Sequence, residues 1–366
     1  MRAKRRVGLL FGGTSVEHEV SVVSARGVSG ALDPKHFEVV PIGVTAEGRW
    51  LTPAASRSIL DSKAERVEGQ GDGARLVIDP GAGLRSLDAR GSEPLPIDAV
   101  FSVVHGWGGE DGRFQGLLEI AGIPVVGPGV LGSAVGMDKQ VAKALFQERG
   151  IPVGPWRALR RERWEAGAKA VEAELVQALG LPVFVKPANG GSSVGISKVR
   201  EAGALGEALA DAFAHDAKAV IERGLDAREI ECAVLGNAAP EVSVCGEIVP
   251  SREFYDYASK YEDGTSELLI PAPIPASLSD RIRSLALAAF DALELSGMAR
   301  VDFFLDRGTG EVFLNEVNTL PGFTPISMYP KLWEASGRAY PELLARLIDL
   351  AVERFESERR RQIRRP

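Results

Sequence analysis

The segment FLNEVNTLPG, residues 313–322, places an acid and an amide two residues apart within a run of strand-forming residues. A strand directs residues i and i+2 to the same side, so Glu316 and Asn318 should share one face. Upstream, ARVDFFLD (299–306) is separated from EVFLNEVN (311–318) by the turn residues Arg307–Gly310. Two strand patterns around such a turn predict a β-hairpin.

In this hairpin Asp302 is expected to stand opposite Glu316, with Phe304 opposite Leu314 as an apolar floor. Two carboxylates and the Asn318 amide oxygen are hard ligands, which Mg²⁺ prefers when phosphates complete its coordination shell. Adjacent carboxylates without a cation would repel each other. The alternative is a solvated hairpin rim, but the combination favours a metal site at Asp302, Glu316 and Asn318.

A magnesium site implies a phosphate-binding loop, and ANGGSSVG (188–195) has the composition of one. Its glycines would let the backbone approach phosphate, and Ser192 and Ser193 would add hydroxyl donors. Lys186 precedes the loop on a predicted strand, and Lys139 lies on the preceding helix. Lysines are most often solvated, but two beside a Gly/Ser loop in an acidic protein favour a phosphate clamp.

Other nucleotide-binding patterns are absent or weak in this sequence. It contains no GxxxxGK[ST] motif, which excludes a P-loop. GPGVLG (127–132) matches GxGxxG, but it contains a proline and lacks an acidic residue about 20 positions later, so we interpret it as a turn.

Composition restricts the remaining possibilities. The 366 residues allow two or three packed modules, and a net charge of −7 argues against a general nucleic-acid binder. The two cysteines, Cys232 and Cys245, form no zinc-binding pattern and fit a reducing compartment. The sequence lacks both a signal-peptide pattern and an apolar run of about 20 residues, so we expect a cytoplasmic protein.

The elements that must position these residues follow an alternating pattern at first. Predicted strands at 6–11, 37–44 and 97–106 alternate with helices at 15–32 and around 114–121, which is typical of a parallel α/β sheet. Residues 53–95 should contain short strands and surface insertions, and IPVVG (123–127) a further short strand.

Beyond residue 128 the pattern changes toward strands. Strands are expected at 181–187 and 218–225, then in EIECAVLG, EVSVCGEIV, LLIPAPI and the hairpin, with helices near 139–149, 279–296 and 341–359. We expect domains at 1–127, 128–225 and 226–366.

Taken in order along the chain, several motifs resemble those of the D-alanine–D-alanine ligases of the ATP-grasp superfamily. They are FGGTSVEHEVS (11–21), VHGWGGEDG (104–112), MDK (137–139), VKPANGGSSVG (185–195), EFYDYASKY (253–261), ARVD (299–302) and NEVNTLPGFTPIS (315–327). The resemblance covers nearly the whole chain. It implies a mixed α/β fold, with an N-terminal Rossmann-like domain and two ATP-grasp subdomains that hold ATP between antiparallel sheets.

The resemblance also implies roles for individual residues. ATP would contact Lys139, Lys186, Ser193, Glu222, Leu225 and Glu229, with Phe304 beside it, and two Mg²⁺ or Mn²⁺ ions would be bound by Asp302, Glu316 and Asn318. The sequence departs from the family at Gly224, where an aromatic residue is common, so this position offers adenine no aromatic contact.

The implied reaction joins two D-alanines through an acyl phosphate. Glu17 would pair with the first ammonium, although Thr14–Glu17 also fits a capping box. His105 would help to position this substrate, although a lone histidine is more often structural. Arg300 and the Gly322 N–H would stabilise the tetrahedral oxyanion.

The second D-alanine would be held by Lys260 and Ser327. Tyr261 would link with Ser192 and Glu17 in a loop that closes the site; the alternative is a surface loop packed on the core. Retention of the tyrosine favours a dipeptide over D-alanyl-D-lactate or D-alanyl-D-serine. A ligase with another substrate and a non-catalytic nucleotide-binding protein are the competing hypotheses. The resemblance implies a homodimer, with no nucleic-acid or membrane partner.

Overall fold

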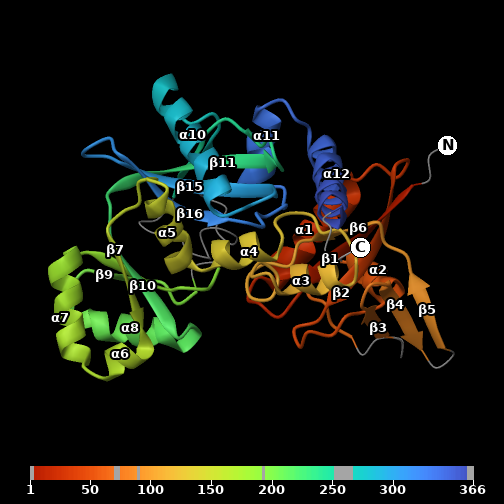
Figure 1. Cartoon of the computed structure of the whole chain (residues 1–366), viewed down its shortest axis with the longest axis horizontal. Helices are drawn as coiled ribbons and strands as arrows, with labels where there is room; N and C mark the ends of the chain where they lie inside the picture. Colours follow the sequence, from red (N-terminus) through yellow and green to blue (C-terminus); the bar gives the residue numbers. More distant parts are fainter. Residues whose placement is uncertain (1–3, 70–74, 89–90, 192–193, 251–266, 361–366) are drawn as a thin grey trace.

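The computed structural model describes residues 4–69, 75–88, 91–191, 194–250 and 267–360. Figure 1 shows three groups of elements. The N-terminal strands and helices lie at one end of the long axis, the central strands with α6 to α8 lie at the other end, and the C-terminal sheet lies between them at the top.

The N-terminal sheet is parallel, with strand order β2-β1-β6. It is formed by β1 (Arg5–Gly12), β2 (Phe37–Val44) and β6 (Ala99–Ser102), and α1 (His18–Ala31) packs against β1. The parallel sheet expected from the sequence is therefore confirmed. The helix expected from residue 15 begins three residues later, because Glu17 occupies the N-cap position.

Residues 53–95 form one helix as well as the expected short strands. The helix α2 (Pro53–Leu60) begins after Thr52, whose hydroxyl accepts from Ala55 N at 3.4 Å, and Pro53 suits the first turn. An antiparallel sheet follows, made of β3 (Arg75–Asp79), β4 (Gly83–Asp88) and β5 (Gly91–Leu95). The expected strand at 123–127 is reduced to one bridge between Val125 and Val100.

Three helices lead from this region to the central sheet. They are α3 (Arg113–Ile120), α4 (Val130–Met137) and α5 (Lys139–Glu148). The interpretation of GPGVLG as a turn is wrong for its second half, since α4 starts at Val130. Asp138 separates α4 from α5 and caps α5, accepting from Val141 N at 3.0 Å.

The central sheet is antiparallel, with order β7-β10-β8-β9. Its strands are β7 (Trp156–Arg160), β8 (Val183–Pro187), β9 (Ser197–Val199) and β10 (Lys218–Arg223). The accompanying helices are α6 (Arg161–Glu165), α7 (Ala168–Leu179), α8 (Leu205–His215) and the short 3₁₀ helix η1 (Ala202–Ala204).

The C-terminal sheet is antiparallel too, with order β14-β13-β11-β15-β16 and β12 (Glu241–Val242) paired to β11. It comprises β11 (Ala227–Gly236), β13 (Gly246–Val249), β14 (Glu267–Leu269), β15 (Gly297–Asp306) and β16 (Val312–Asn318). The helices here are α10 (Ala276–Ala292), α11 (Met328–Ala335) and α12 (Tyr340–Arg359).

The predicted hairpin is β15–β16, and its register contains one irregularity. Asp302 stands opposite Glu316, as expected, but the register shifts immediately afterwards. Phe304 therefore stands opposite Phe313, so its predicted pairing with Leu314 is wrong. Leu314 instead faces Phe303 and is buried in the core. The bulge leaves Asn315 as the extra residue of β16.

The buried side chains divide into separate clusters. One joins β1 and α1 to α12 and to residues of β11, β13 and β15, so it ties the two ends of the sequence together. The central sheet has a core of its own, built from residues between Leu159 and Ile221. Among the described residues, no helix is both long and apolar enough to span a membrane.

Candidate active site

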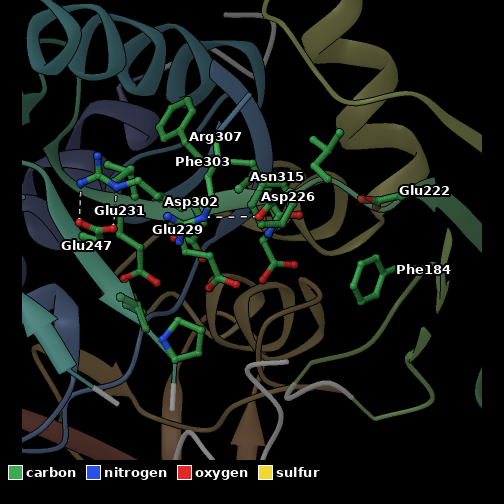
Figure 2. Close-up of a pocket in the computed structure, with 18 of the residues that line it drawn as sticks. Phe184, Glu222, Asp226, Glu229, Glu231, Glu247, Asp302, Phe303, Arg307 and Asn315 are labelled. Carbon is green, nitrogen blue, oxygen red and sulfur yellow. Dashed lines mark hydrogen bonds and ion pairs between the residues drawn. The ribbon is translucent and has the colours of Figure 1, made fainter. Parts of the chain in front are cut away.

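A cavity of about 350 Å³ opens between the central and C-terminal sheets, where β8 and β10 face β11, β13, β15 and β16. This volume suits a small-molecule ligand. The structure brings eight of the sequence-predicted residues to its wall: Lys186, Glu222, Leu225, Glu229, Arg300, Asp302, Phe304 and Glu316. Figure 2 shows Glu222 and Phe184 on one side of this space and Glu229, Glu231 and Asp302 on the sheet opposite.

The acidic side of the cavity is organised by Arg300. Its Nε and Nη2 donate to the two oxygens of Asp302 at 2.8 and 2.7 Å, and its Nε also lies 3.1 Å from Glu231 Oε2. Burial works against the charged guanidinium, but Asp302 and Glu231 outweigh it and raise the pKa of Arg300 further. A cation therefore already stands beside the predicted metal ligand Asp302.

The basic side of the cavity contains a cluster of buried lysines around Glu222. Lys186 Nζ lies 3.3 Å from Glu222 Oε2, and Lys143 Nζ lies 3.4 Å from Glu222 Oε1. Burial alone would raise the pKa of Glu222, but these two ammonium groups lower it. The charge of Glu316 acts on the pKa of Lys139, Lys143 and Lys186 alike, so the carboxylate face and the lysines form one electrostatic site.

Glu17 lies outside the cavity lining but close to Gly191 of the glycine-rich loop. Its side chain is buried, and α1 begins at His18, so Glu17 is the N-cap and not the third residue of a capping box. A Cβ built on Gly191 would come within 2.9 Å of Glu17 Oε2, and one built on Gly106 within 3.1 Å. Glu17 is therefore enclosed by glycines of two separate loops, which fits a role in a site better than a local cap.

His105 is buried next to this group. Its Nδ1 lies 3.7 Å from Glu110 Oε1, while Glu110 Oε2 accepts from Gly106 N at 2.8 Å. Burial alone would lower the pKa of His105, but the hydrogen bond with Glu110 and the charges of Glu17 and Glu110 raise it. The histidine can therefore carry a proton close to Glu17.

Four other predicted residues lie around the cavity without lining it. Lys139 donates from Nζ to the Gly190 carbonyl at 2.8 Å, at the start of the glycine loop. Asn318 stands opposite Arg300, and its Oδ1 accepts from Leu320 N at 3.2 Å. A Cβ on Gly322 would meet Ser327 Oγ at 2.7 Å, so Gly322 and Ser327 are neighbours. Ser327 Oγ also accepts from Thr324 N at 3.0 Å.

The remaining predicted residues, Ser192, Ser193, Lys260 and Tyr261, lie outside the described part of the chain. The loop that was expected to close the site is among these residues. Its predicted contacts stay predictions.

Sequence reasoning missed three buried charged residues of the site. Lys143 follows Lys139 by one helical turn, and its Nζ donates to the Asn315 carbonyl at 3.0 Å. The spacing MDKQVAK could have revealed it as a second lysine on the same face of α5. Glu231 follows Glu229 by two on β11, so strand alternation could have put it on the same face as Glu229. Glu110 lies in the GWGGEDG motif itself.

Gly224, the position that departs from the family pattern, is closely packed. A Cβ there would come within 3.1 Å of Pro182 and 3.5 Å of the Phe184 ring. The Phe184 side chain lines the cavity. The backbone of Gly224 donates to Pro182 O at 2.8 Å. Phe184 on β8 therefore provides an aromatic side chain to the cavity next to Gly224.

Comparison with known proteins points to one family. The sequence matches the family described as D-ala D-ala ligase N-terminus over residues 6–128 and D-ala D-ala ligase C-terminus over residues 145–349. It is 52% identical to D-alanine–D-alanine ligase A of Chromobacterium violaceum, covering 96% of both chains. It is 48% identical to a D-alanine–D-alanine ligase of Geobacillus thermodenitrificans, covering 97% of both.

Solved structures resemble it over nearly its whole length as well. The D-alanine-D-alanine ligase from Coxiella burnetii has a TM-score of 0.84 and 36% identity, with 97% of each chain covered. The VanG D-Ala:D-Ser ligase from Enterococcus faecalis has a TM-score of 0.83 and 36% identity, covering 95% of this chain and all of that one. The chain thus has the ATP-grasp fold and belongs to the D-alanine–D-alanine ligase family.

Proposed function

We propose that this enzyme joins two molecules of D-alanine to D-alanyl-D-alanine and converts ATP to ADP and phosphate. The observation that carries the proposal is the facing pair of charged surfaces in one cavity: Arg300, Asp302 and Glu316 on the C-terminal sheet, and the lysines around Glu222 on the other side. A carboxylate becomes an acyl donor only after phosphorylation, and such a step needs phosphate held between cations.

The nucleotide would occupy the cavity between the two antiparallel sheets. Lys186 and Lys139 would bind its phosphates, together with the loop that contains Ser193. Glu222, Leu225 and Glu229 would lie along the adenosine, and Phe304 would cover it. Support comes from the cavity lining, to which Lys186, Glu222, Leu225, Glu229 and Phe304 all contribute.

Two divalent cations would be held by Asp302, Glu316 and Asn318. The fit is favourable because Asp302 and Glu316 face each other and already attract the cationic Arg300. Within the described residues no three His, Cys, Asp or Glu side chains could hold a metal together, so the set needs the Asn318 amide and phosphate oxygens. A bound Mg²⁺ would neutralise charge on the transferring phosphoryl group.

The first D-alanine would be held by Glu17, whose carboxylate would pair with its ammonium, and by His105. Ser192 and Tyr261 would complete the enclosure of this site. Because the raised pKa of His105 favours its protonated form, His105 would orient the substrate carboxylate toward the lysine side.

The second D-alanine would place its carboxylate near Lys260 and Ser327 and its amine toward the acyl phosphate. Arg300 and the Gly322 N–H would then stabilise the oxyanion that forms on attack. The neighbouring positions of Gly322 and Ser327 support an oxyanion donor close to the second substrate.

The alternative is a different second substrate, D-serine or D-lactate. The similarity to a D-Ala:D-Ser ligase structure shows that the fold alone does not distinguish these products. The curated relatives at 48% and 52% identity carry the D-alanine–D-alanine ligase name, which favours the dipeptide. We further propose three domains at 1–127, 128–225 and 226–366, a cytoplasmic location, a homodimer and a role in making peptidoglycan precursors.

The test is ATP-dependent phosphate release from the purified protein with D-alanine, D-serine, D-lactate and a panel of L-amino acids. We expect release with D-alanine alone, and mass spectrometry should identify the dipeptide. Release only with D-alanine plus D-serine or D-lactate would establish the alternative, and activity only with a non-alanine amino acid would disprove the proposal.

A further inference from the structure

Three carboxylates stand at one level across adjacent strands of the C-terminal sheet. Glu231 on β11 faces Asp302 on β15, and Asp302 faces Glu316 on β16. All three line the cavity, and Glu231 and Asp302 are only 4% and 8% exposed. Figure 2 shows Glu231 beside Asp302. Such a row is costly unless cations are arranged along it.

Arg300 supplies that cation, and its guanidinium contacts Asp302 more closely than Glu231. Two of its donors bind both oxygens of Asp302, at 2.8 and 2.7 Å, while Glu231 Oε2 lies 3.1 Å from the same Nε. Asp302 is thus fully engaged by the guanidinium. A divalent cation at Asp302 would compete for those oxygens and repel Arg300.

We propose that Glu231 is a positioning residue that retains Arg300 at the site when Asp302 exchanges the guanidinium for a divalent cation. This inference rests on the proposed function, in which Asp302 binds metal and Arg300 stabilises the oxyanion. Glu231 can fulfil this role because it belongs to a different strand and its ion pair with Arg300 does not use the Asp302 oxygens. Without it, metal binding would leave a buried guanidinium without its nearest remaining anion, which is unfavourable.

A neighbouring ion pair provides a matched comparison. Glu247 on β13 binds Arg228 through both oxygens, at 2.7 and 2.6 Å, and like Glu231 it is buried and lines the cavity. Its arginine is bonded to Glu247 and to the Pro273 carbonyl. Removal of the Glu247 charge therefore changes the electrostatic potential in the cavity, while the contacts of Arg300 with Asp302 and Glu231 are retained.

The experiment measures binding of Mn²⁺ in the presence of ADP, by electron paramagnetic resonance of the free ion, so no turnover is needed. We expect E231Q to weaken Mn²⁺ binding about tenfold, because the metal-loaded state loses the anchor of Arg300. E247Q should stay within about twofold of the wild type. In an Arg300→Met background the additional change E231Q should alter binding less than about twofold, since no guanidinium remains to be held.

The outcomes separate this inference from the proposed function. Equal weakening by E231Q with and without Arg300 would mean that Glu231 attracts the cation directly, and the inference would be wrong. Unchanged binding in E231Q would also overturn it. Wild-type binding in D302N would instead disprove the metal assignment itself. Should E231Q fail to fold in a thermal melt without ligand, E231D keeps the charge at shorter reach, and the same cycle with Arg300→Met applies.

Discussion

Glu222 is held between two buried ammonium groups, which makes its ionisation a source of stability. Burial raises the pKa of Glu222, and the charges of the two lysines lower it. The effect of the lysines is larger, so the pKa lies below the ordinary value of 4.5. A group with a depressed folded pKa stabilises the protein above its unfolded pKa, and this contribution is lost as the pH falls through the folded pKa. The stabilisation by Glu222 should therefore be complete at neutral pH and decline below about pH 4.5.

The variant E222Q tests this expectation. Urea unfolding at pH 7 should show a loss of about 3–5 kcal/mol relative to the wild type, because two buried ammonium groups lose their shared partner. The difference between the two proteins should stay constant from pH 7 to about pH 4.5 and shrink as the pH is lowered further. A difference that does not shrink below pH 4.5 would show that packing, and not charge, explains the loss.

Lys143 joins three segments at one buried ammonium: α5, the Glu222 carboxylate and the carbonyl of the bulge residue Asn315. Burial and the charge of Lys186 lower the pKa of Lys143, while Glu222 and Glu316 oppose this effect. The substitution K143M keeps a side chain of similar length and removes its charge, so Glu222 loses one of its two lysine partners. We expect a loss of about 1.5–3 kcal/mol in the free energy of unfolding, because Glu222 keeps Lys186 as a partner.

K143R is the control for this substitution, since it restores the charge with a different shape. Arginine should recover part of the stability, and the Michaelis constant for ATP should lie between those of the wild type and K143M. Equal behaviour of K143R and K143M would indicate that size at this position matters and that the charge does not.

At the level of elements, two glycine loops converge on Glu17. One follows β6 and contains Gly106; the other follows β8 and contains Gly191. Because a Cβ at Gly191 would stand 2.9 Å from Glu17 Oε2, G191A should displace this carboxylate. We expect the Michaelis constant for D-alanine to rise at least about tenfold, the effect of losing a charged contact of roughly 1.4 kcal/mol.

G190A is the matched control in the same loop. A Cβ at Gly190 would meet only Pro187 Cγ, at an ordinary contact distance of 3.5 Å. The KM for D-alanine of G190A should therefore remain close to that of the wild type. A similar increase in both variants would show that loop stiffness, and not the position of Glu17, controls the substrate.

The elements also show how far the sequence could lead. Strand alternation was sufficient to predict that Asp302 lies opposite Glu316 and that Arg300 shares a face with Asp302. In a regular strand every second side chain points to the same side. It failed one residue later, where the bulge at Asn315 moved Leu314 to the core and Phe313 to the face of Phe304. Nothing in local propensity marks the extra residue Asn315, whose carbonyl accepts a hydrogen bond from the distant Lys143.

Helix α4 shows the same limit for helices. Gly132 was interpreted as part of a turn, yet both Gly132 and Gly136 of this helix lie against other elements. A Cβ at Gly132 would come within 2.9 Å of Leu295, and one at Gly136 within 2.5 Å of Thr319. Close tertiary packing, which is invisible in a local pattern, requires the small residues that weaken the helix signal. Lys143 and Glu231 share a face with the predicted Lys139 and Glu229, but their contacts with Glu222 and Arg300 arise only in the tertiary structure.

At the level of the whole molecule, the N-terminal and C-terminal regions share one core, and the central sheet has another. Phe323 is at the junction: its ring lies 5.2 Å from that of Phe101 on β6 and 5.8 Å from that of Tyr329 on α11. Its carbonyl also accepts from the Tyr340 hydroxyl at 3.1 Å. The helix α12 packs against α1 and β6 as well as β11 and β15, and Figure 1 shows it standing beside α1 and β6.

This arrangement predicts that the two ends of the chain unfold together while the central sheet responds separately. F323A should reduce the free energy of unfolding by about 3–5 kcal/mol, the cost of a large core truncation. Native-state hydrogen exchange should then show equal loss of protection in β1 and β15 and a smaller loss in β8 and β10.

L209A, which truncates a fully buried side chain in the core of the central sheet, should give the reverse pattern. Uniform loss of protection in both variants would mean that the N-terminal parallel sheet, the central sheet and the C-terminal sheet form one cooperative unit.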